Sequence, residues 1–404
     1  MKTPYEVAVE TRVGDREVVR FRTADGVHNK RSLRPAELAL AETVWEATPE
    51  TAVVVDANYG VVGTLAALQT RETPSPSRTT ESRPASRTRV TMTCASARAG
   101  RLARVNAAST GVEARVAVTA DPTRLPRRFE AAAYAPKPYT PTAMGKRRVL
   151  DALRALEPNG ALFLAARDDA GCARYESCLE TVGAEPVELR QRGSVRLLRA
   201  SRPAEIDHRV VRPTRRSVSV AGETIRLVTV PGVFAAPGLD DGTRLLLERV
   251  VADRESGGTS GAGSAHVIGD DERVLDACCG AGPVAATVGR ATRASVWATD
   301  DDPVAVACAR RTLDASGVSA TVRLGDCVAS VASQSFDRVV CNPPTHAGSD
   351  VLRELFRGIE RLLASDGVCS LVHHRSLAFD EWLAPFDSVW EGAGDETYRV
   401  RHCA

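Results

Sequence analysis

The sequence predicts an α/β protein with two similar doubly wound domains in tandem, each a mostly parallel sheet flanked by helices. Three observations lead to this prediction: the length of 404 residues, an internal repeat, and short apolar runs that alternate with helical segments such as 303–316 and 350–364. Domains usually have about 100 to 200 residues, so a chain of this length should contain two. Alternating strands and helices are typical of βαβ units, which build parallel sheets.

The internal repeat relates the two halves of the chain. Residues 23–44 resemble residues 229–250 at an offset of 206. An apolar run that ends in Asp56 resembles one that ends in Asp276, at an offset of 220, and a glycine follows four residues later in both. Each half should therefore be one copy of the same domain.

Two insertions and one linker explain the changing offset. Residues 73–88 are rich in Pro, Ser, Thr and Arg, and residues 255–269 are rich in Gly and Ser, as is typical of surface loops. Prolines interrupt the pattern within residues 201–217. We therefore expect the two domains to be residues 1–203 and residues 204–404.

Charge is unevenly distributed between the halves. Residues 1–203 contain 32 Lys and Arg against 23 Asp and Glu, whereas residues 204–404 contain 21 against 28. A basic half suggests binding to a polyanion, and scattered solvated charge is the alternative. All but four of the basic residues are arginine, which suits bidentate phosphate contacts. The linker arginines (Arg209, Arg212, Arg215 and Arg216) either contact phosphate or keep the linker solvated.

Cysteine usage and hydropathy predict a cytoplasmic protein. The ten cysteines include no CxxC pair, which favours reduced thiols over a disulfide scaffold or a zinc site. The pair His373–His374 has no third ligand at metal spacing, so no metal is expected. No apolar stretch approaches the ~18 residues that span a membrane, and no signal peptide precedes the first domain.

The second half contains the features of a nucleoside-binding site. One apolar run leads into a tight turn at residues 276–282, where ligands of open α/β sheets come close to the backbone. Asp300 ends the next apolar run, a place where an acid commonly accepts hydrogen bonds from ribose hydroxyls. Asp326 ends a third run and could reach an adenine amine. Each acid alone is more often solvated surface, but their order favours a nucleoside-containing ligand.

The turn indicates which nucleoside ligand is bound. A nicotinamide dinucleotide needs the pattern G-x-G-x-x-G, which seats its pyrophosphate at a helix N-terminus. Residues 276–282 lack this pattern. S-adenosyl-L-methionine has no pyrophosphate to seat, and it is therefore the expected cofactor.

A fourth apolar run ends in the triplet Asn342, Pro343 and Pro344, which we interpret as the reaction centre. The nitrogen of an amide-like or aromatic amine has a delocalised lone pair, so its methylation requires positioning rather than strong base catalysis. The Asn342 side-chain oxygen and the Pro343 carbonyl can each accept one amine hydrogen. An ordinary rigid loop is the alternative. Cys341 precedes the triplet and is interpreted as core packing rather than as a nucleophile.

Several motifs together resemble the ribosomal RNA guanine-N2 methyltransferase family. They are Val230–Phe234, Gly238–Thr243, the Asp276 turn and Asn342–Gly348, and the resemblance covers nearly the whole chain. It implies two tandem Rossmann-like class I methyltransferase domains, of which the first has lost catalysis. It implies cofactor binding by Asp276, Gly280, Gly282, Asp300 and Asp326, to which we add Cys278, Asp240 and Phe234. It implies contacts to the target amine from Asn342 and Pro343, with Pro344 completing the turn.

The first copy has lost the residues expected to act in the second. In the repeat, Asn342 corresponds to Ala135, Pro344 to Lys137, Gly282 to Val62 and Asp240 to Arg34. The first copy should therefore bind or orient RNA, with scaffolding as the alternative.

Two positions depart from the family pattern. Thr345 stands where the family usually has an aromatic residue that stacks on the extruded base, and His346 is the expected substitute for stacking. Cys278 stands where the turn usually has glycine. Both Thr345 and His346 are expected to contact the substrate.

The leading hypothesis is methylation of the exocyclic N2 amine of a guanine in structured RNA, with ribosomal RNA or a ribosomal subunit as partner. The base is expected to flip into the pocket, because chemistry on a stacked base is blocked. One alternative is an adenine-N6 or protein glutamine-N5 acceptor. Another is a non-catalytic RNA-binding or assembly protein that keeps the fold as a scaffold. We expect a monomer.

Overall fold

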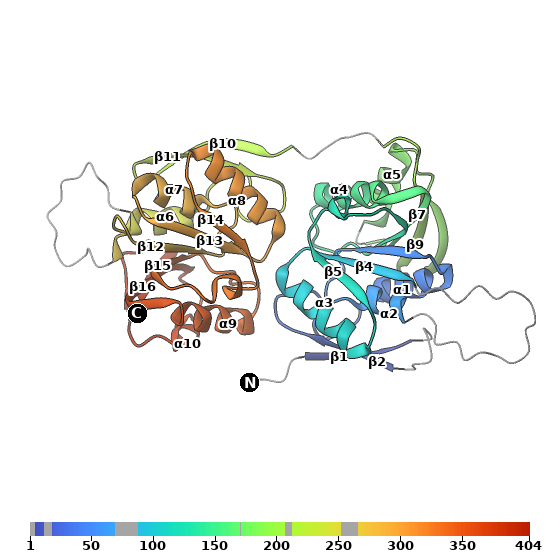
Figure 1. Cartoon of the computed structure of the whole chain (residues 1–404), viewed down its shortest axis with the longest axis horizontal. Helices are drawn as coiled ribbons and strands as arrows, with labels where there is room; N and C mark the ends of the chain where they lie inside the picture. Colours follow the sequence, from blue (N-terminus) through green and yellow to red (C-terminus); the bar gives the residue numbers. More distant parts are fainter. Residues whose placement is uncertain (1–4, 12–17, 69–87, 170, 207–211, 252–265) are drawn as a thin grey trace, which may run out of the picture. The chain divides into compact units, whose positions relative to one another are not determined.

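The computed structural model describes residues 5–11, 18–68, 88–169, 171–206, 212–251 and 266–404. The chain divides into two compact units, Met1–Val211 and Arg212–Ala404 (Figure 1). This division lies within the segment 201–217 that the sequence analysis proposed as the linker. The inserted stretches 73–87 and 255–265, and Arg209, lie outside the described residues.

The first unit contains a seven-stranded sheet of order β5-β4-β3-β6-β7-β9-β8. Its strands from β5 to β7 are parallel, and β9 runs antiparallel to both of its neighbours. The strands are β3 (Thr51–Val55), β4 (Arg89–Cys94), β5 (Ala114–Val118), β6 (Phe129–Tyr134), β7 (Leu156–Arg167), β8 (Val187–Arg192) and β9 (Val195–Ser201).

The second unit repeats this topology in the order β14-β13-β12-β15-β16-β18-β17. Its strands are β12 (Arg273–Ala277), β13 (Ser295–Asp300), β14 (Thr321–Leu324), β15 (Phe336–Cys341), β16 (Leu363–His374), β17 (Val389–Glu391) and β18 (Tyr398–Cys403). A two-stranded sheet precedes each large sheet: β1 (Tyr5–Glu10) with β2 (Val18–Thr23), and β10 (Thr214–Val220) with β11 (Glu223–Thr229). The expected fold of two tandem α/β domains is confirmed.

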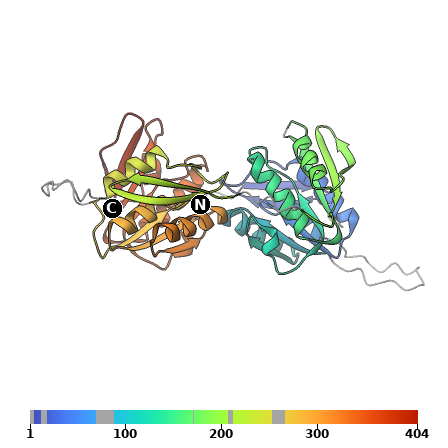
Figure 2. The same ribbon diagram turned by 90° about the horizontal axis from the view of Figure 1, so that it is seen from above.

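Helices cover both faces of each sheet (Figures 1 and 2). The first unit has α1 (Pro35–Ala47), α2 (Val61–Ala67), α3 (Ala97–Thr110), α4 (Thr142–Arg154) and α5 (Cys172–Thr181). The second has α6 (Asp241–Val250), α7 (Pro283–Ala291), α8 (Pro303–Ser316), α9 (Ser349–Glu360) and α10 (Asp380–Leu383). Short 3-10 helices, η1 (Pro122–Arg124) and η3 (Ala329–Val331), occupy matching places.

The central strand β3 shows why the apolar runs are continuous. All five of its residues are buried. Val54 joins the core on the side of α1, α2 and α3, whereas Val53 and Val55 join the core on the side of α4 and α5. A strand with a helical layer on each face is apolar at most positions, as residues 52–55 show. The charged groups of a site in this fold are therefore expected near the ends of such strands.

Local capping explains the helix bounds in both copies. Ser96 accepts a hydrogen bond from the Ala99 amide at the start of α3, and Asp302 accepts one from the Val304 amide at the start of α8. Both helices end at a glycine in the left-handed region. The helix expected over residues 303–316 is confirmed. The helix expected over 350–364 is too long by four residues, because the Leu362 carbonyl already accepts from Phe336 and joins the chain to β15.

Strand register corrects one match within the repeat. In the first unit Val54 of β3 pairs with Met92 of β4. In the second unit Asp276 of β12 holds the same place, since it pairs with Ala298 of β13, the counterpart of Met92. The offset across this strand is thus 222 rather than 220, so Asp56 is the counterpart of Cys278. The correspondence of Gly282 with Val62 is also wrong. Gly60 takes that place, since Gly60 and Gly282 each cap the next helix.

Gly282 provides a test of this packing. It has a φ of +78°, and a Cβ there would lie 3.1 Å from the Cα of Ala309 in α8. We expect Gly282→Ala to lower the free energy of unfolding through about 1–2 kcal/mol of left-handed strain and about 1–3 kcal/mol of overpacking. Urea unfolding followed by circular dichroism measures the loss. Gly317→Ala is the control, because Gly317 has a φ of +70° but open space around it. Equal losses in the two variants would contradict the proposed close approach.

Candidate active site

An open pocket lies at the carboxyl ends of β12 and β15 in the second unit. It contains about 450 Å³ of empty space, including its mouth. It is lined by Leu227, Phe234, Ala235, Gly238, Leu239, Asp240, Thr243, Asp276, Cys278, Cys279, Gly280, Ala281, Pro283, Val284 and Asn342. The fold thus brings together the segment after β11, the turn after β12 and the end of β15, as parallel strands predict.

The turn after β12 is built from left-handed backbone. Cys278 has a φ of +61° and Gly280 one of +53°. This conformation explains why glycine suits position 278, since a side chain there costs conformational energy. The Gly280 amide donates to Asp300 Oδ2 at 2.8 Å, and the Ala285 amide of α7 donates to Asp276 Oδ2 at 3.0 Å. The turn and the start of α7 are therefore held by one carboxylate in β12 and one at the end of β13.

Both carboxylates accept hydrogen bonds from backbone amides, but burial still disfavours their negative charge. Burial, aided by the nearby charge of Asp300, raises the pKa of Asp276 to about 8. Burial also raises the pKa of Asp300 to about 6, although the backbone amides of Asp302 and Gly280 oppose the shift. A cationic ligand would stabilise their ionised forms. The site is thus suited to a ligand that combines positive charge with hydroxyl groups.

Asn342 follows β15 directly, and its side chain is held in one orientation. Its Nδ2 donates to Asp240 Oδ2 and to Thr243 Oγ1, both at 2.9 Å. Because a carboxylate only accepts hydrogen bonds, the amide nitrogen must face Asp240. Both amide hydrogens are then used, and the Oδ1 oxygen remains to accept a hydrogen from a ligand.

Asp240 connects this asparagine to a helix start. Its Oδ2 also accepts from the Thr243 amide at 2.9 Å, which makes Asp240 the N-cap of α6. Asp240 lines the pocket, as expected of a cofactor-binding residue, but its observed contacts are with Asn342 and Thr243. Thr243 was not among the predicted site residues. Its position three residues after a capping aspartate was the signal that could have identified it.

The other predicted residues lie at varying distances from the pocket wall. Phe234 lines the mouth with 59% of its surface exposed. Pro343 is buried, and its carbonyl accepts from the Thr345 amide at 2.9 Å, so one lone pair remains for another donor. Gly282, Asp300, Asp326, Pro343, Pro344, Thr345 and His346 do not line the pocket itself. Asp326 is buried just beyond β14, and Thr345 and His346 are exposed on the loop after the triplet.

The cysteines of the site are thiols held in the core. All ten cysteines of the chain are free. A hydrogen bond with Cys278, together with burial, raises the pKa of Cys341 well above its usual value. Such a thiol does not ionise near neutral pH, so Cys341 is unsuited to nucleophilic attack. Within the described residues, no three His, Cys, Asp or Glu side chains gather as metal ligands, and no helix is long and apolar enough to cross a membrane.

In the first unit a side chain also links the start of a helix to the end of a strand, but here the residue before the helix donates the hydrogen bonds instead of accepting them. Arg34 replaces Asp240 as the residue before α1, and its guanidinium donates to the Ala135 carbonyl at 3.1 Å and to the Pro136 carbonyl at 2.9 Å. It also donates to Glu37, the counterpart of Thr243. The carbonyls that correspond to those of Asn342 and Pro343 are therefore occupied by a buried arginine.

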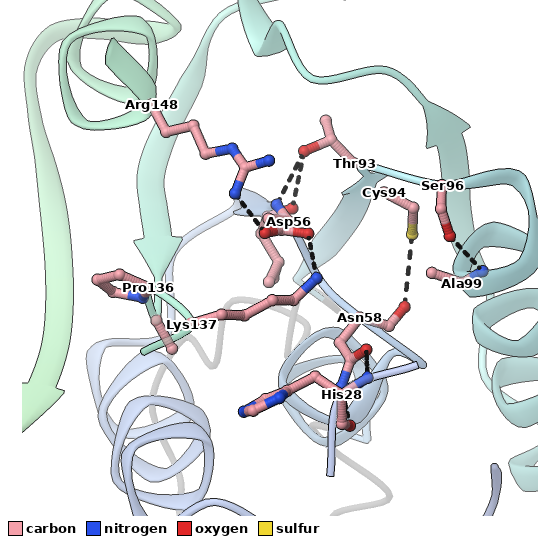
Figure 3. A network of polar contacts seen from close by, with 12 residues as sticks. His28, Asp56, Asn58, Thr93, Cys94, Ser96, Ala99, Pro136, Lys137 and Arg148 are labelled. Carbon is pink, nitrogen blue, oxygen red and sulfur yellow. Dashed lines mark hydrogen bonds and ion pairs between the residues drawn. The ribbon is translucent and has the colours of Figure 1, made fainter. Parts of the chain in front are cut away.

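A second network occupies the place of the turn in the first unit (Figure 3). Lys137 Nζ lies 3.0 Å from Asp56 Oδ1, and Arg148 NH1 lies 2.6 Å from Asp56 Oδ2. Burial opposes ionisation, but the charges of Lys137 and Arg148 hold the pKa of Asp56 below its usual range. Lys137 replaces Pro344, and Arg148 replaces the buried Leu355.

The counterpart of Phe234 in this network is His28. The Asn58 side chain accepts from its amide at 3.3 Å and donates to its carbonyl at 2.9 Å, as Figure 3 shows. Burial lowers the pKa of His28 to about 4, so the ring is neutral near pH 7. The first unit thus fills the corresponding region with its own paired side chains.

Comparison with known proteins defines the class and then the family. Residues 224–401 match the model of the methyltransferase small domain. Ribosomal RNA small subunit methyltransferase C of Pseudomonas paraeruginosa is 31% identical over 268 residues, which cover 63% of this chain and 74% of that protein. The chain therefore belongs to the ribosomal RNA small subunit methyltransferase C family, which confirms the resemblance seen in its sequence.

Other relatives match mainly over one region. The relative of the same name from Hahella chejuensis is 34% identical over 166 residues, 40% of this chain and 44% of the relative. That from Chromohalobacter salexigens is 35% identical over 181 residues, 44% of this chain and 50% of the relative. The matched region thus spans about half the length of these proteins.

A solved structure shows the same two-domain fold. The T. thermophilus 16S rRNA N2 G1207 methyltransferase, in complex with AdoMet and guanosine, has a TM-score of 0.73 at 23% identity. The similarity covers 95% of this chain and 95% of that chain. It therefore includes both units and not the second alone.

The buried ion pairs of Asp56 in the first unit predict that removing one of its two cations lowers the stability of the protein. Lys137→Met leaves the Asp56 carboxylate, which has 2% of its side chain exposed, with one cation instead of two. We expect a loss of about 3 kcal/mol in the free energy of unfolding, measured by urea titration. Lys146→Met is the control, because Lys146 has no ion pair within the described residues. A loss of similar size in the control would contradict this role of Lys137.

The raised pKa of Asp276 predicts a dependence of stability on pH. A carboxyl with a higher pKa in the folded state binds more protons there, so folding is most favoured at low pH. Stability should fall as the pH rises from about 4 to about 8, between the unfolded and folded pKa values. Thermal unfolding at several pH values should show a shallower fall for Asp276→Asn than for the wild type. Asp271→Asn, an exposed carboxyl of the same unit, should keep the wild-type slope; a wild-type slope in Asp276→Asn would contradict the assignment.

Proposed function

We propose that this chain is an S-adenosyl-L-methionine-dependent methyltransferase that methylates the exocyclic N2 amine of a guanine in small-subunit ribosomal RNA. The observation that carries the proposal is the fixed Asn342 side chain, which lines one pocket together with Asp276 and the turn after β12. The names of the relatives and the AdoMet and guanosine in the T. thermophilus complex support it.

The residues present fit the cofactor. S-adenosyl-L-methionine supplies a methyl group on a positively charged sulfonium and also carries an ammonium group and ribose hydroxyls. Asp276 lies in the pocket wall, and its ionised form gains stability beside a cation. We assign Asp300 to the ribose hydroxyls and Asp326 to the adenine amine, as the sequence suggested. Phe234, Cys278, Gly280 and Gly282 complete the proposed cofactor contacts, with Asp240 acting through Asn342.

Positioning of the amine carries the catalysis in this proposal. Asn342 Oδ1 and the free lone pair of the Pro343 carbonyl each accept one hydrogen of the guanine NH2 group, with Pro344 stiffening the turn. These two hydrogen bonds would leave the nitrogen lone pair free of the protein. The bound cofactor would supply the methyl group and become a neutral thioether, while the amine would lose one proton to solvent. Asp240 is a positioning residue, since it acts by holding the Asn342 amide.

The target base also needs a surface to stack on. Thr345 and His346 are exposed on the loop after the triplet and remain the proposed substrate contacts. Phe234 adds an exposed ring at the pocket mouth. Because position 345 is threonine and not aromatic, the Phe234 ring is a larger stacking surface than the side chains of the loop. A flipped guanine can then enter the pocket edge-first.

The two domains divide the work in this proposal. Residues 204–404 form the catalytic domain. Residues 1–203 form a non-catalytic domain that binds RNA, because Arg34 and the Asp56 network occupy its former site and its net charge is positive. The enzyme acts as a monomer on ribosomal RNA in the cytoplasm.

Nucleoside mass spectrometry tests the proposal. Ribosomal RNA from cells lacking the gene should lose one N2-methylguanosine, which the wild-type gene restores and Asn342→Ala does not. For the purified variant, we expect a fall in kcat on the order of a hundredfold, as for loss of one preorganised hydrogen-bonding group. Calorimetry should show nearly unchanged cofactor affinity.

The control variant is Asp241→Asn, an exposed carboxyl next to Asp240 in α6. It should restore the modification like the wild type. An unchanged nucleoside profile in the deletion strain would exclude the proposed acceptor. Loss of a different methylated nucleoside would identify an adenine or another base as the acceptor, and full turnover by Asn342→Ala would refute the role of that residue.

A further inference from the structure

Four arginines of the first unit surround an open pocket that shares no lining residue with the sites described above. The pocket contains about 940 Å³ of empty space, including its mouth. It is lined by Thr123, Arg128, Arg147, Asp151, Arg154, Arg202 and Ile206. Three of the seven side chains are not arginine, and only one of those carries negative charge. The pocket therefore has a strongly positive lining.

Topology places this pocket at the amino-terminal edge of the first sheet. Arg128 directly precedes β6, and Arg154 ends α4 just before β7. Arg202 follows β9, which runs antiparallel to β7. Ligands of this fold bind at the opposite edge, where the parallel strands have their carboxyl ends. The arginine pocket is thus no remnant of the lost cofactor site.

One buried carboxylate organises half of the cluster. Asp151 has 4% of its side chain exposed, and it accepts hydrogen bonds from Arg147 Nε and from Arg154 NH1. The bonds fix two guanidinium groups in place before a ligand arrives, which lowers the entropy cost of binding.

The other two arginines of the cluster are free to bind a ligand. Neither Arg128 nor Arg202 forms an ion pair with any described residue, and the Nε of Arg202 is buried without a hydrogen-bond partner. Burial raises the pKa of Asp151, so four guanidinium groups and this carboxyl leave an excess of at least three positive charges. An anion with several acceptor oxygens would satisfy these donors.

The fold itself does not require this cluster. At the offset of 207 that relates β6 to β15 and α4 to α9, the second unit has Ser335, Glu354 and Gly358 in place of Arg128, Arg147 and Asp151. Of the pocket residues on these elements, only Arg154 keeps its residue type, as Arg361. The same topology therefore forms without Arg128, Arg147 and Asp151, so the fold does not require these three residues.

We propose that this arginine pocket binds phosphodiester groups of the RNA backbone. The planar, five-donor guanidinium matches phosphate oxygens bidentately. The pocket is open and much larger than one phosphate group, which suits a passing polymer better than a small free anion. The proposal rests on the proposed function, in which the substrate is RNA, and it locates the RNA contact on the side of the first unit opposite its degenerate site.

The full chain with Arg128→Gln and Arg202→Gln tests the proposal. Neither residue supports another described side chain, so the unfolding temperature should not change. We expect the Kd for a small-subunit ribosomal RNA transcribed in vitro to rise about tenfold at moderate salt. The slope of log K against log salt should become shallower by about 1.5 to 2, as for two lost phosphate contacts.

The matched control is Arg22→Gln with Arg115→Gln. These arginines are exposed in the same unit, and the double variant loses the same charge. Its Kd should change less than twofold. An unchanged Kd and salt slope in the pocket variant would overturn the proposal, and so would an equal loss in the control, which would show a general charge effect. Tight binding of inorganic phosphate that excludes the RNA would replace the polymer site with a small-anion site.

The outcome is separable from that of the proposed function. Calorimetry with the cofactor, and turnover at saturating RNA, report on the second unit and should be unchanged in the pocket variant. If the wild type binds RNA through the arginines but methylates none, the pocket stands and the proposed reaction fails. If the wild type methylates RNA with the same KM as the pocket variant, the reaction stands and the pocket proposal fails.

Discussion

The hydrogen bonds from Asn342 to Asp240 and Thr243 are the interactions on which the rest of the site depends. They join the first turn of α6 to the end of β15, two segments about 100 residues apart in the chain. The bonds consume the donors of the asparagine and leave its acceptor exposed. The Asp240 carboxylate therefore caps α6, holds the end of β15 and determines that the Asn342 oxygen, rather than its nitrogen, is left to accept from a ligand.

The duplicated domain shows how that constraint can be retained while its chemistry is lost. Arg34 makes the same connection in the first unit, but it donates where Asp240 accepts. The connection to the strand end is retained, and a buried guanidinium now lies against its carbonyls. Asp56, Lys137 and Arg148 then replace an open site by a buried charge cluster whose partners satisfy one another.

The first unit also carries a cluster of positive charge at a second place in its fold. The arginine pocket lies at the other edge of the same sheet, where the second unit has Ser335, Glu354 and Gly358 in place of Arg128, Arg147 and Asp151. A tandem enzyme can thus separate the chemical step from the recognition of a large polyanion.

The sequence by itself determined the two tandem domains, the order of their strands and helices, and the Asn342 triplet at a strand end, because periodicity and turn residues act locally. It matched Asp56 with Asp276, whereas the structure makes Cys278 the counterpart of Asp56. An apolar run followed by an aspartate and a later glycine fits two registers, and only the pairing of β3 with β4 selects one of them. The sequence also could not show that Asp240 holds Asn342, or that Arg128 and Arg202 meet in one pocket. Those relations join residues far apart in the chain, and only the packing of strands and helices into a tertiary structure brings their side chains within contact distance.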